Sequence, residues 1–237
     1  MVKKSVPMER GEKAVAEEKS SSSDIARFLK AAEQTASTPG GRLVFALDAT
    51  MSRQPTWDRA CQIQASMFQV AGAASGLAVQ LVYFRGFGEC RASKWVTNPA
   101  SLAQMMTRID CRGGTTQISK VFMHANKESS KHRIAALVYI GDAMEEPVDR
   151  ICDLAGKLGL KGVKAFMFQE GMDRDAEHAF REVARLTNGA YMRLSSSSAK
   201  ELEELLKAVA AFATGGKTAL ENHRGKSAQA LLEQLKR

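Results

Sequence analysis

Short, wholly apolar segments that alternate with helical stretches constrain the fold of this chain more than any other feature. Residues 43–48 read LVFALD and residues 134–142 read IAALVYIGD, and each suits a strand buried on both faces. The same pattern predicts strands at 77–84, 90–96, 162–168 and 190–194, and helices at 55–75, 99–109, after Thr116, and at 145–159, 174–187 and 199–213. Strands separated by such helices predict an α/β, doubly wound, Rossmann-like sheet, mainly parallel and six-stranded, with helices on both faces.

The two ends of the chain differ from this central part, 41–213. Residues 1–23 are rich in Lys, Glu and Ser, and this composition predicts a disordered tail. Residues 24–40 predict an amphipathic helix and a linker, because Ile25, Phe28, Leu29 and Ala32 share one helical face. Residues 214–237 predict a basic tail with a short helix, whose apolar face favours packing on the domain over docking to a partner.

The charge of the chain indicates neither a nucleic-acid surface nor a membrane surface. The net charge of +8 divides into +1 over residues 1–40, +4 over 41–213 and +3 over 214–237, so no run of like charge dominates. The basic ending is the part to test for RNA binding; its cations are Lys217, Arg224, Lys226, Lys236 and Arg237. No long apolar segment or signal-peptide core is present, and we expect a cytoplasmic location without a membrane span.

Cysteine and histidine side chains give no zinc pattern. Cys61, Cys90, Cys111 and Cys152 form no CxxC pair, and the four histidines lack metal-ligand spacing. The sequence GGKT at 215–218 lacks the first glycine of a phosphate-binding loop, because position 211 is alanine, and it is interpreted as the end of a helix. A phosphatase of the haloacid dehalogenase type is disfavoured because Thr50 stands where the second aspartate would lie.

Oxygen-bearing side chains follow the two most apolar strands. Asp48, Thr50 and Ser52 alternate directly after residues 43–48, and Asp142 ends the segment 134–142. The carboxyl ends of parallel strands are where ligands bind in doubly wound sheets. Carboxylates and hydroxyls suit a hard cation such as Mg²⁺. For the first three residues alone, the alternative is a strand end that caps the next helix.

A third segment, RIDCRGGTTQISK, places Thr115 and Thr116 after two glycines and before a predicted helix. The three segments together resemble the von Willebrand factor type A family over residues 41–213. In that family a metal-ion-dependent adhesion site combines a DxSxS loop, a threonine of a second loop and an aspartate after the fourth strand. The resemblance therefore implies an interaction domain with a metal site, and no catalysis.

Residue by residue, the resemblance implies five metal ligands: Asp48, Thr50, Ser52, Thr116 and Asp142. Thr116 is chosen because Ile118 falls where the family's next helix has its first apolar residue, and Thr115 is the alternative. The implied cation is Mg²⁺, with Mn²⁺ or Ca²⁺ as alternatives, and the implied partner is a protein that offers an Asp or Glu to the metal. Gly141 and Ala143 depart from the threonine and glycine that usually flank the last aspartate.

Two other hypotheses remain for the function of the chain, because some intracellular relatives of the fold work with RNA and others are subunits of chelatase or AAA-type ATPase assemblies. The oligomeric state stays open. The sequence Glu145-Glu146-Pro147 is interpreted as a helix start, with the acids favoured by the helix dipole. Its alternative is an acidic rim beside the metal site.

Overall fold

A six-stranded sheet forms the centre of the computed structural model, which describes residues 41–53, 76–194, 199–223 and 225–235. Its strands are β1 (Arg42–Asp48), β2 (Ala78–Arg85), β3 (Glu89–Ala92), β4 (Ala136–Gly141), β5 (Lys164–Gln169) and β6 (Ala190–Arg193). They lie in the order β3-β2-β1-β4-β5-β6, with β3 antiparallel to β2 and the other neighbours parallel. The predicted doubly wound, mainly parallel α/β sheet is confirmed.

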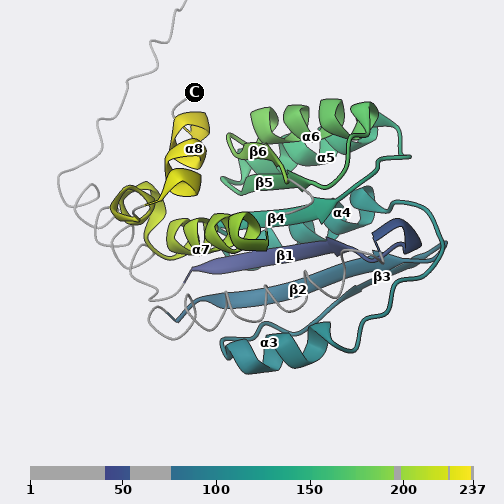
Figure 1. The fold of residues 1–237 in the computed structure, drawn as a ribbon, viewed down its shortest axis with the longest axis horizontal. Coiled ribbons are helices and arrows are strands. Elements are labelled where there is room, and N and C mark those ends of the chain that lie inside the picture. Colours follow the sequence, from purple (N-terminus) through teal and green to yellow (C-terminus); the bar gives the residue numbers. More distant parts are fainter. Residues whose placement is uncertain (1–40, 54–75, 195–198, 224, 236–237) are drawn as a thin grey trace, which may run out of the picture. The chain divides into compact units, whose positions relative to one another are not determined.

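Helices lie on both faces of this sheet (Figure 1). The described helices are the 3₁₀ turn η1 (Met51–Arg53) and α3 (Pro99–Met106), α4 (Ile118–Ser129), α5 (Val148–Leu160), α6 (Arg174–Leu186), α7 (Ala199–Asn222) and α8 (Lys226–Leu235). Residues of α3, α7 and α8 share one core with Leu43, Phe45 and Leu47 of β1. Residues of α4, α5 and α6 share the other with Val44 and Ala46. Alternate residues of one strand thus enter opposite halves of the core, as the two-residue period of a strand requires.

The structure shifts several predicted boundaries. The edge strand predicted at 90–96 is β3 at Glu89–Ala92, and Val96 makes only an isolated bridge to Val79. The helix predicted from residue 145 begins at Val148, because Glu145 and Glu146 turn toward another helix, as described below. The predictions for 1–23, 24–40 and 55–75 lie outside the described residues.

The C-terminal helices pack on the sheet. The chain kinks at Gly215 and Gly216, where Gly216 has a φ of 64°, so the break predicted at GGKT is present although helix continues to Asn222. On α8, Ala228 and Leu231 are buried, and Leu232 and Leu235 pack against the same core. None of the described helices is long and apolar enough to cross a membrane.

The strand order reverses between β1 and β4. From β1 the chain builds the sheet outward through β2 and β3, and from β4 it builds the opposite half through β5 and β6. Crossover connections leave in opposite directions at such a point, and ligand sites of doubly wound sheets lie at the carboxyl ends of these two strands. This position holds Asp48 and, directly after β4, Asp142.

Candidate functional site

Asp48 and Asp142 stand side by side at the switch point of the sheet. Leu47 pairs with Ile140, so Asp48 follows one step beyond that pair and Asp142 two steps beyond it on the neighbouring strand. Asp48 is fully buried, whereas Asp142 is partly exposed. Two carboxylates from separate segments therefore reach one end of the sheet.

The loop after β1 gathers its three predicted ligands by hydrogen bonds. The Thr50 N–H donates to Asp48 Oδ1 at 2.8 Å, and the Thr50 and Ser52 hydroxyls lie 3.1 Å apart. Thr50 is buried and Ser52 is exposed. Thr50 also forms a bridge with Arg112, which fixes this loop against the segment that leads to Thr116. The alternating pattern thus brings one carboxylate and two hydroxyls together.

The second loop brings Thr116 to the segment that follows Asp142. The Thr116 N–H donates to Glu145 Oε2 at 2.9 Å, and the Glu145 N–H donates to Thr116 Oγ1 at 2.9 Å. Thr116 is buried, while Thr115 is exposed and donates its N–H to Gly86 O. Among the described residues, no direct hydrogen bond joins Thr116 or Asp142 to the side chains of the Asp48 loop.

Glu145 and Glu146 have a role that the sequence interpretation missed. Glu146 accepts hydrogen bonds from the Ile118 N–H, from the Ser119 N–H at 3.1 Å and from the Ser119 hydroxyl. The N-cap residue of α4, Gln117, makes no capping hydrogen bond of its own, so Glu146 supplies the acceptor and the negative charge that a helix N-terminus favours. A helix dipole does favour Glu146, but the helix is α4 and not α5, which follows the two acids. Sequence could not show this, because the helix they cap precedes them by 28 residues.

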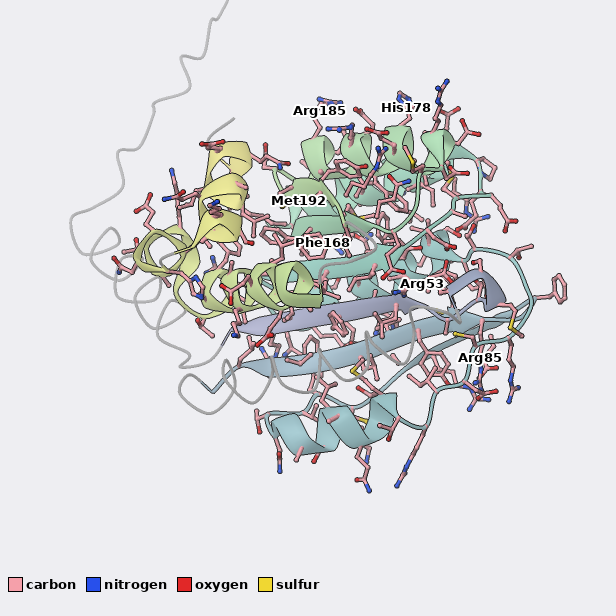
Figure 2. The ribbon with its side chains drawn as sticks, in the orientation of Figure 1. Arg53, Arg85, Phe168, His178, Arg185 and Met192 are labelled. Atoms are coloured by element: carbon pink, nitrogen blue, oxygen red, sulfur yellow. The ribbon has the colours of Figure 1, made fainter. Side chains whose placement is uncertain are left out.

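Arg53, the residue after Ser52, is a second residue that the sequence reasoning missed. Its side chain is fully buried and forms a two-pronged ion pair with Glu170, with N···O distances of 2.8 and 3.1 Å. Its Nη1 donates to Asp48 O at 2.9 Å and to Ile140 O at 3.5 Å. Figure 2 shows Arg53 at this end of β1. Arg53 therefore ties the first loop to the ends of β4 and β5.

A polar residue directly after a buried strand was the signal for Asp48 and Asp142, and Glu170 directly follows β5 in the same way. Applied to every strand, this rule could have found Glu170. Burial lowers the pKa of Arg53, but the opposite charge and hydrogen bonds of Glu170 together outweigh this effect and raise the pKa above its ordinary value. The pair is thus a charged but compensated element beside the carboxylates.

Three buried polar atoms at the switch point find no hydrogen-bond partner among the described residues: Asp48 Oδ2, Asp142 Oδ1 and the Tyr139 hydroxyl. The described part of the chain holds only two other such atoms, at Asn126 and His223. An unpaired buried polar group costs about 1–3 kcal/mol, so a cluster of them calls for a physical reason. Three of the five such atoms of the described residues therefore lie at this end of the sheet.

Tyr139 explains the departure at Gly141. A Cβ atom on Gly141 would meet the Tyr139 hydroxyl at 2.5 Å and its ring at 2.8 Å, so no side chain fits there unless Tyr139 moves. Both residues face the same side of β4 because they are two apart. The tyrosine therefore fills the space where a residue-141 side chain would lie, and it brings a hydroxyl to that space.

The electrostatics of Asp48 are unfavourable to its charge. Burial raises the pKa of Asp48 from 3.8 to about 6; hydrogen bonds from Thr50 and the charge of Arg53 oppose the rise, and the charge of Asp142 adds to it. Burial also raises the pKa of Tyr139 well above its usual value, and the charges of Asp48 and Asp142 add to that rise. The protein alone thus leaves negative charge at this position undercompensated.

Within the described residues, no group of three or more His, Cys, Asp and Glu side chains is arranged to hold a metal ion. The five predicted ligands differ in composition from such a group, with two carboxylates and the three hydroxyls of Thr50, Ser52 and Thr116. Hard cations accept such mixed oxygen donors, whereas zinc prefers nitrogen and sulfur. Cys90, Cys111 and Cys152 are free thiols.

Comparisons with known proteins identify the fold. No protein-family model and no curated protein matches the sequence. Among solved structures, the chain is similar to von Willebrand factor type A from Catenulispora acidiphila, with a TM-score of 0.62 and 14% identity over 75% of this chain and 43% of that one. It is also similar to the SpRpn10 VWA domain, with a TM-score of 0.55 and 12% identity over 69% of this chain and 94% of that one.

A third similar structure is the pilus adhesin SpaC from Lactobacillus rhamnosus GG, with a TM-score of 0.59 and 11% identity over 79% of this chain and 31% of that one. The chain spans less than half of the length of the Catenulispora protein and of SpaC. These likenesses define the class of the domain. The chain has the von Willebrand factor type A fold.

Proposed function

We propose that this chain is a protein-interaction module whose switch-point residues hold a divalent cation, and that this cation receives a carboxylate from a partner protein. Asp48, Thr50, Ser52, Thr116 and Asp142 are the proposed ligands, directly or through water, and Mg²⁺ is the proposed ion. When bound, the ion supplies a position that attracts a further negatively charged oxygen. The proposed role is binding and not catalysis.

The cluster of unpaired buried oxygens carries this proposal. Asp48 Oδ1 accepts a hydrogen bond from the Thr50 N–H, whereas Asp48 Oδ2 and Asp142 Oδ1 find no partner among the described residues. Burial raises the pKa of Asp48, and the negative charge of Asp142 adds to the rise. A cation between the two carboxylates would offset both the desolvation of Asp48 and the repulsion between the two negative charges. The residues present therefore fit a hard cation.

Thr116 fits as a ligand from the second loop. Its Oγ1 accepts one hydrogen bond from the Glu145 N–H, which orients the hydroxyl and leaves a lone pair for a further contact. The adhesin among the similar structures is a binding protein by its name, which agrees with a binding role for this fold. The hypotheses of an RNA-associated protein and of a subunit in an ATPase assembly stay predictions.

A metal titration tests the proposal. Unfolding of the full chain is measured with and without Mg²⁺, and the wild type should gain about 2.7 kcal/mol at an Mg²⁺ concentration 100 times the dissociation constant. Asp142→Asn should lose this gain. Asp153→Asn should keep it, because Asp153 is an exposed carboxylate on α5 that pairs with Lys157. An equal Mg²⁺ response in wild type and Asp142→Asn would contradict the metal site.

Partner binding needs its own measurement. Proteins retained by the immobilised full chain in Mg²⁺ are compared with those retained in EDTA, and a binding partner should be lost in EDTA and from Asp142→Asn alike. Each retained partner is then tested with its acidic residues replaced by amides. Retention that is indifferent to Mg²⁺ and to Asp142 would contradict the proposed interaction.

A further inference from the structure

Three large apolar side chains stand in solvent around the proposed metal site. Met51 lies between Thr50 and Ser52, Phe87 lies in the turn between β2 and β3, and Met172 follows β5; their exposed fractions are 53%, 87% and 79%. We call these three residues the apolar rim. The other exposed large apolar residues of the described chain, Met123 and Leu160, belong to helices α4 and α5.

All three rim residues lie at one end of the sheet. Each follows the carboxyl end of a strand, and β1, β2 and β5 run in the same direction. Figure 1 shows η1, which contains Met51, and the β2–β3 turn, which contains Phe87, at this end. In the strand order β2-β1-β4-β5, Phe87 and Met172 therefore stand on opposite sides of the pair of strands that carries Asp48 and Asp142.

The exposure of the rim residues does not come from loose loops. The turn of Phe87 is held by hydrogen bonds from the Gln117 side chain to Gly86 O at 3.1 Å and from Lys120 Nζ to Gly88 O at 2.9 Å.

The loop of Met172 is held in the same manner, by Glu170 in its ion pair with Arg53 and by the Gln169 amide, which donates to Asp173 O at 2.7 Å. Aromatic residues and methionine are enriched in protein–protein interfaces, so Phe87 and Met172 are suited to contact a partner.

The strand spacing sets the size of a matching ligand. Adjacent strands of a sheet lie ~4.8 Å apart, and β5 is the third strand from β2, so the distance between β2 and β5 is about 14 Å. An extended peptide advances about 3.4 Å per residue and points every second side chain the same way, so about four residues cover this span. Side chains at positions −2, 0 and +2 of such a peptide then face the surface together.

Resting on the proposed function, we propose that the partner presents an extended segment in which an Asp or Glu has a large apolar residue two positions before it and another two positions after it. The acid binds the cation, one apolar side chain contacts Phe87 and the other contacts Met172. Met51 lies beside the acid. Charge complementarity favours an acidic segment over a purely apolar one, because a dication between two carboxylates accepts an anionic oxygen. The apolar rim surrounds this cation position.

A displayed peptide library tests the proposed motif. Nine-residue peptides with a fixed central Asp and eight random positions are selected on the full chain in Mg²⁺, with a parallel selection in EDTA. Large apolar residues should be enriched at −2 and +2 in Mg²⁺ only. A synthetic peptide of the enriched sequence should lose roughly tenfold in affinity when both flanking residues become Ser, which corresponds to about 1.4 kcal/mol.

Single variants of the apolar rim show which rim residue contacts which flanking position of the peptide, −2 or +2. Phe87→Ser should relax the preference at one of them and Met172→Ser at the other, while the Mg²⁺ affinity of both variants stays that of the wild type. Leu160→Ser is the matched control, because Leu160 is 91% exposed at the end of α5, away from the rim, and should change neither preference.

The outcomes separate this inference from the proposed function. Mg²⁺-dependent binding of acidic peptides without an apolar preference, or with one that survives both rim variants, would overturn the motif and leave the metal site intact. Absence of any Mg²⁺-dependent enrichment would overturn both. A third outcome concerns a second copy of the chain. If the chain self-associates in sedimentation and Phe87→Ser abolishes this association without changing peptide affinity, the rim binds a second copy and the motif is overturned.

Discussion

Two tyrosines of the same sheet are treated in opposite ways. At the β6 edge, the Tyr191 hydroxyl donates to Gln169 Oε1 at 2.7 Å, and the Gln234 amide of α8 bonds both to Tyr191 N at 2.9 Å and to Tyr191 O at 3.0 Å. At the switch point, the fully buried Tyr139 hydroxyl has no partner within the described part of the chain. The β6 edge pairs these polar groups, whereas the switch point leaves three polar atoms without a partner among the described residues.

This difference matches a structural role for the β6 edge and the proposed binding role for the switch point. The β6 edge would expose unpaired backbone groups, and Gln234 closes it from the side, as edge strands require. The switch point is equally protected by its position between β1 and β4, yet it retains unpaired oxygens on Asp48 and Asp142. Burial without pairing is costly, and the proposed cation would offset this cost at the two carboxylates.

The largest effect is expected from the element that holds the switch point together. Arg53→Met removes the buried cation and leaves the Glu170 carboxylate and two carbonyl oxygens without their donor, so it should lower the free energy of unfolding by about 3 kcal/mol. Chemical denaturation measures this. Lys157→Met is the matched control and should cost less, because Lys157 pairs with Asp153 in an exposed ion pair. A loss below 0.5 kcal/mol for Arg53→Met would place the pair among ordinary surface ion pairs.

The next effect concerns pH. The pKa of Asp48 is raised from 3.8 to about 6 by burial, so the folded chain holds this proton more tightly than the unfolded chain. Stability from this group is therefore full below about pH 4 and is lost as the pH rises through about 6. In EDTA, Asp48→Asn should match the wild type near pH 4 and exceed it by up to about 3 kcal/mol at pH 7.

Denaturant unfolding in EDTA from pH 4 to pH 8 measures this difference, with Asp153→Asn as the control for an exposed carboxylate. If the unfolding free energies of wild type and Asp48→Asn differ by the same amount at every pH, the pKa of Asp48 is not raised by its burial. Adding Mg²⁺ at pH 7 should restore the wild type and leave Asp48→Asn unchanged.

The sequence predicted the sheet because the apolar pattern of each strand is local. Residues 43–47 are apolar throughout, and the structure buries all of them. The same locality explains why the position of Asp48 and Asp142 at one end of the sheet could be predicted, since the residue after a buried strand must stand there.

Contacts between distant segments could not be predicted in this way. Glu146 caps a helix that begins 28 residues before it, and Arg53 pairs with a residue 117 positions away. Both are charged residues whose local pattern fits an exposed surface. Gly141 looked like a departure from the motif, and only the position of the Tyr139 ring shows why a side chain is excluded there.

A smaller effect is expected at the satisfied region. Gln234→Ala removes the two hydrogen bonds that close the β6 edge at Tyr191, and it should lower the free energy of unfolding by about 1–2 kcal/mol. The stabilisation by Mg²⁺ should stay equal to that of the wild type, because α8 and the switch point are separate. If this variant gains less stability from Mg²⁺ than the wild type does, the β6 edge and the switch point are coupled and do not have separate roles. Gln229→Ala, an exposed position on the same helix, is the matched control.

The smallest effect on stability is expected from the Tyr139 hydroxyl, and it sharpens the comparison most. Tyr139→Phe deletes an unpaired buried hydroxyl and keeps the ring that packs against Phe180, so the metal-free chain should change by less than about 1 kcal/mol or become more stable. Tyr191→Phe deletes a paired hydroxyl and should cost about 1 kcal/mol. If the Tyr139 hydroxyl serves the bound ion, Tyr139→Phe should weaken Mg²⁺ binding in calorimetry while Tyr191→Phe does not. Equal losses of stability for the two variants, with equal Mg²⁺ affinity, would show that the unpaired hydroxyl has no separate role.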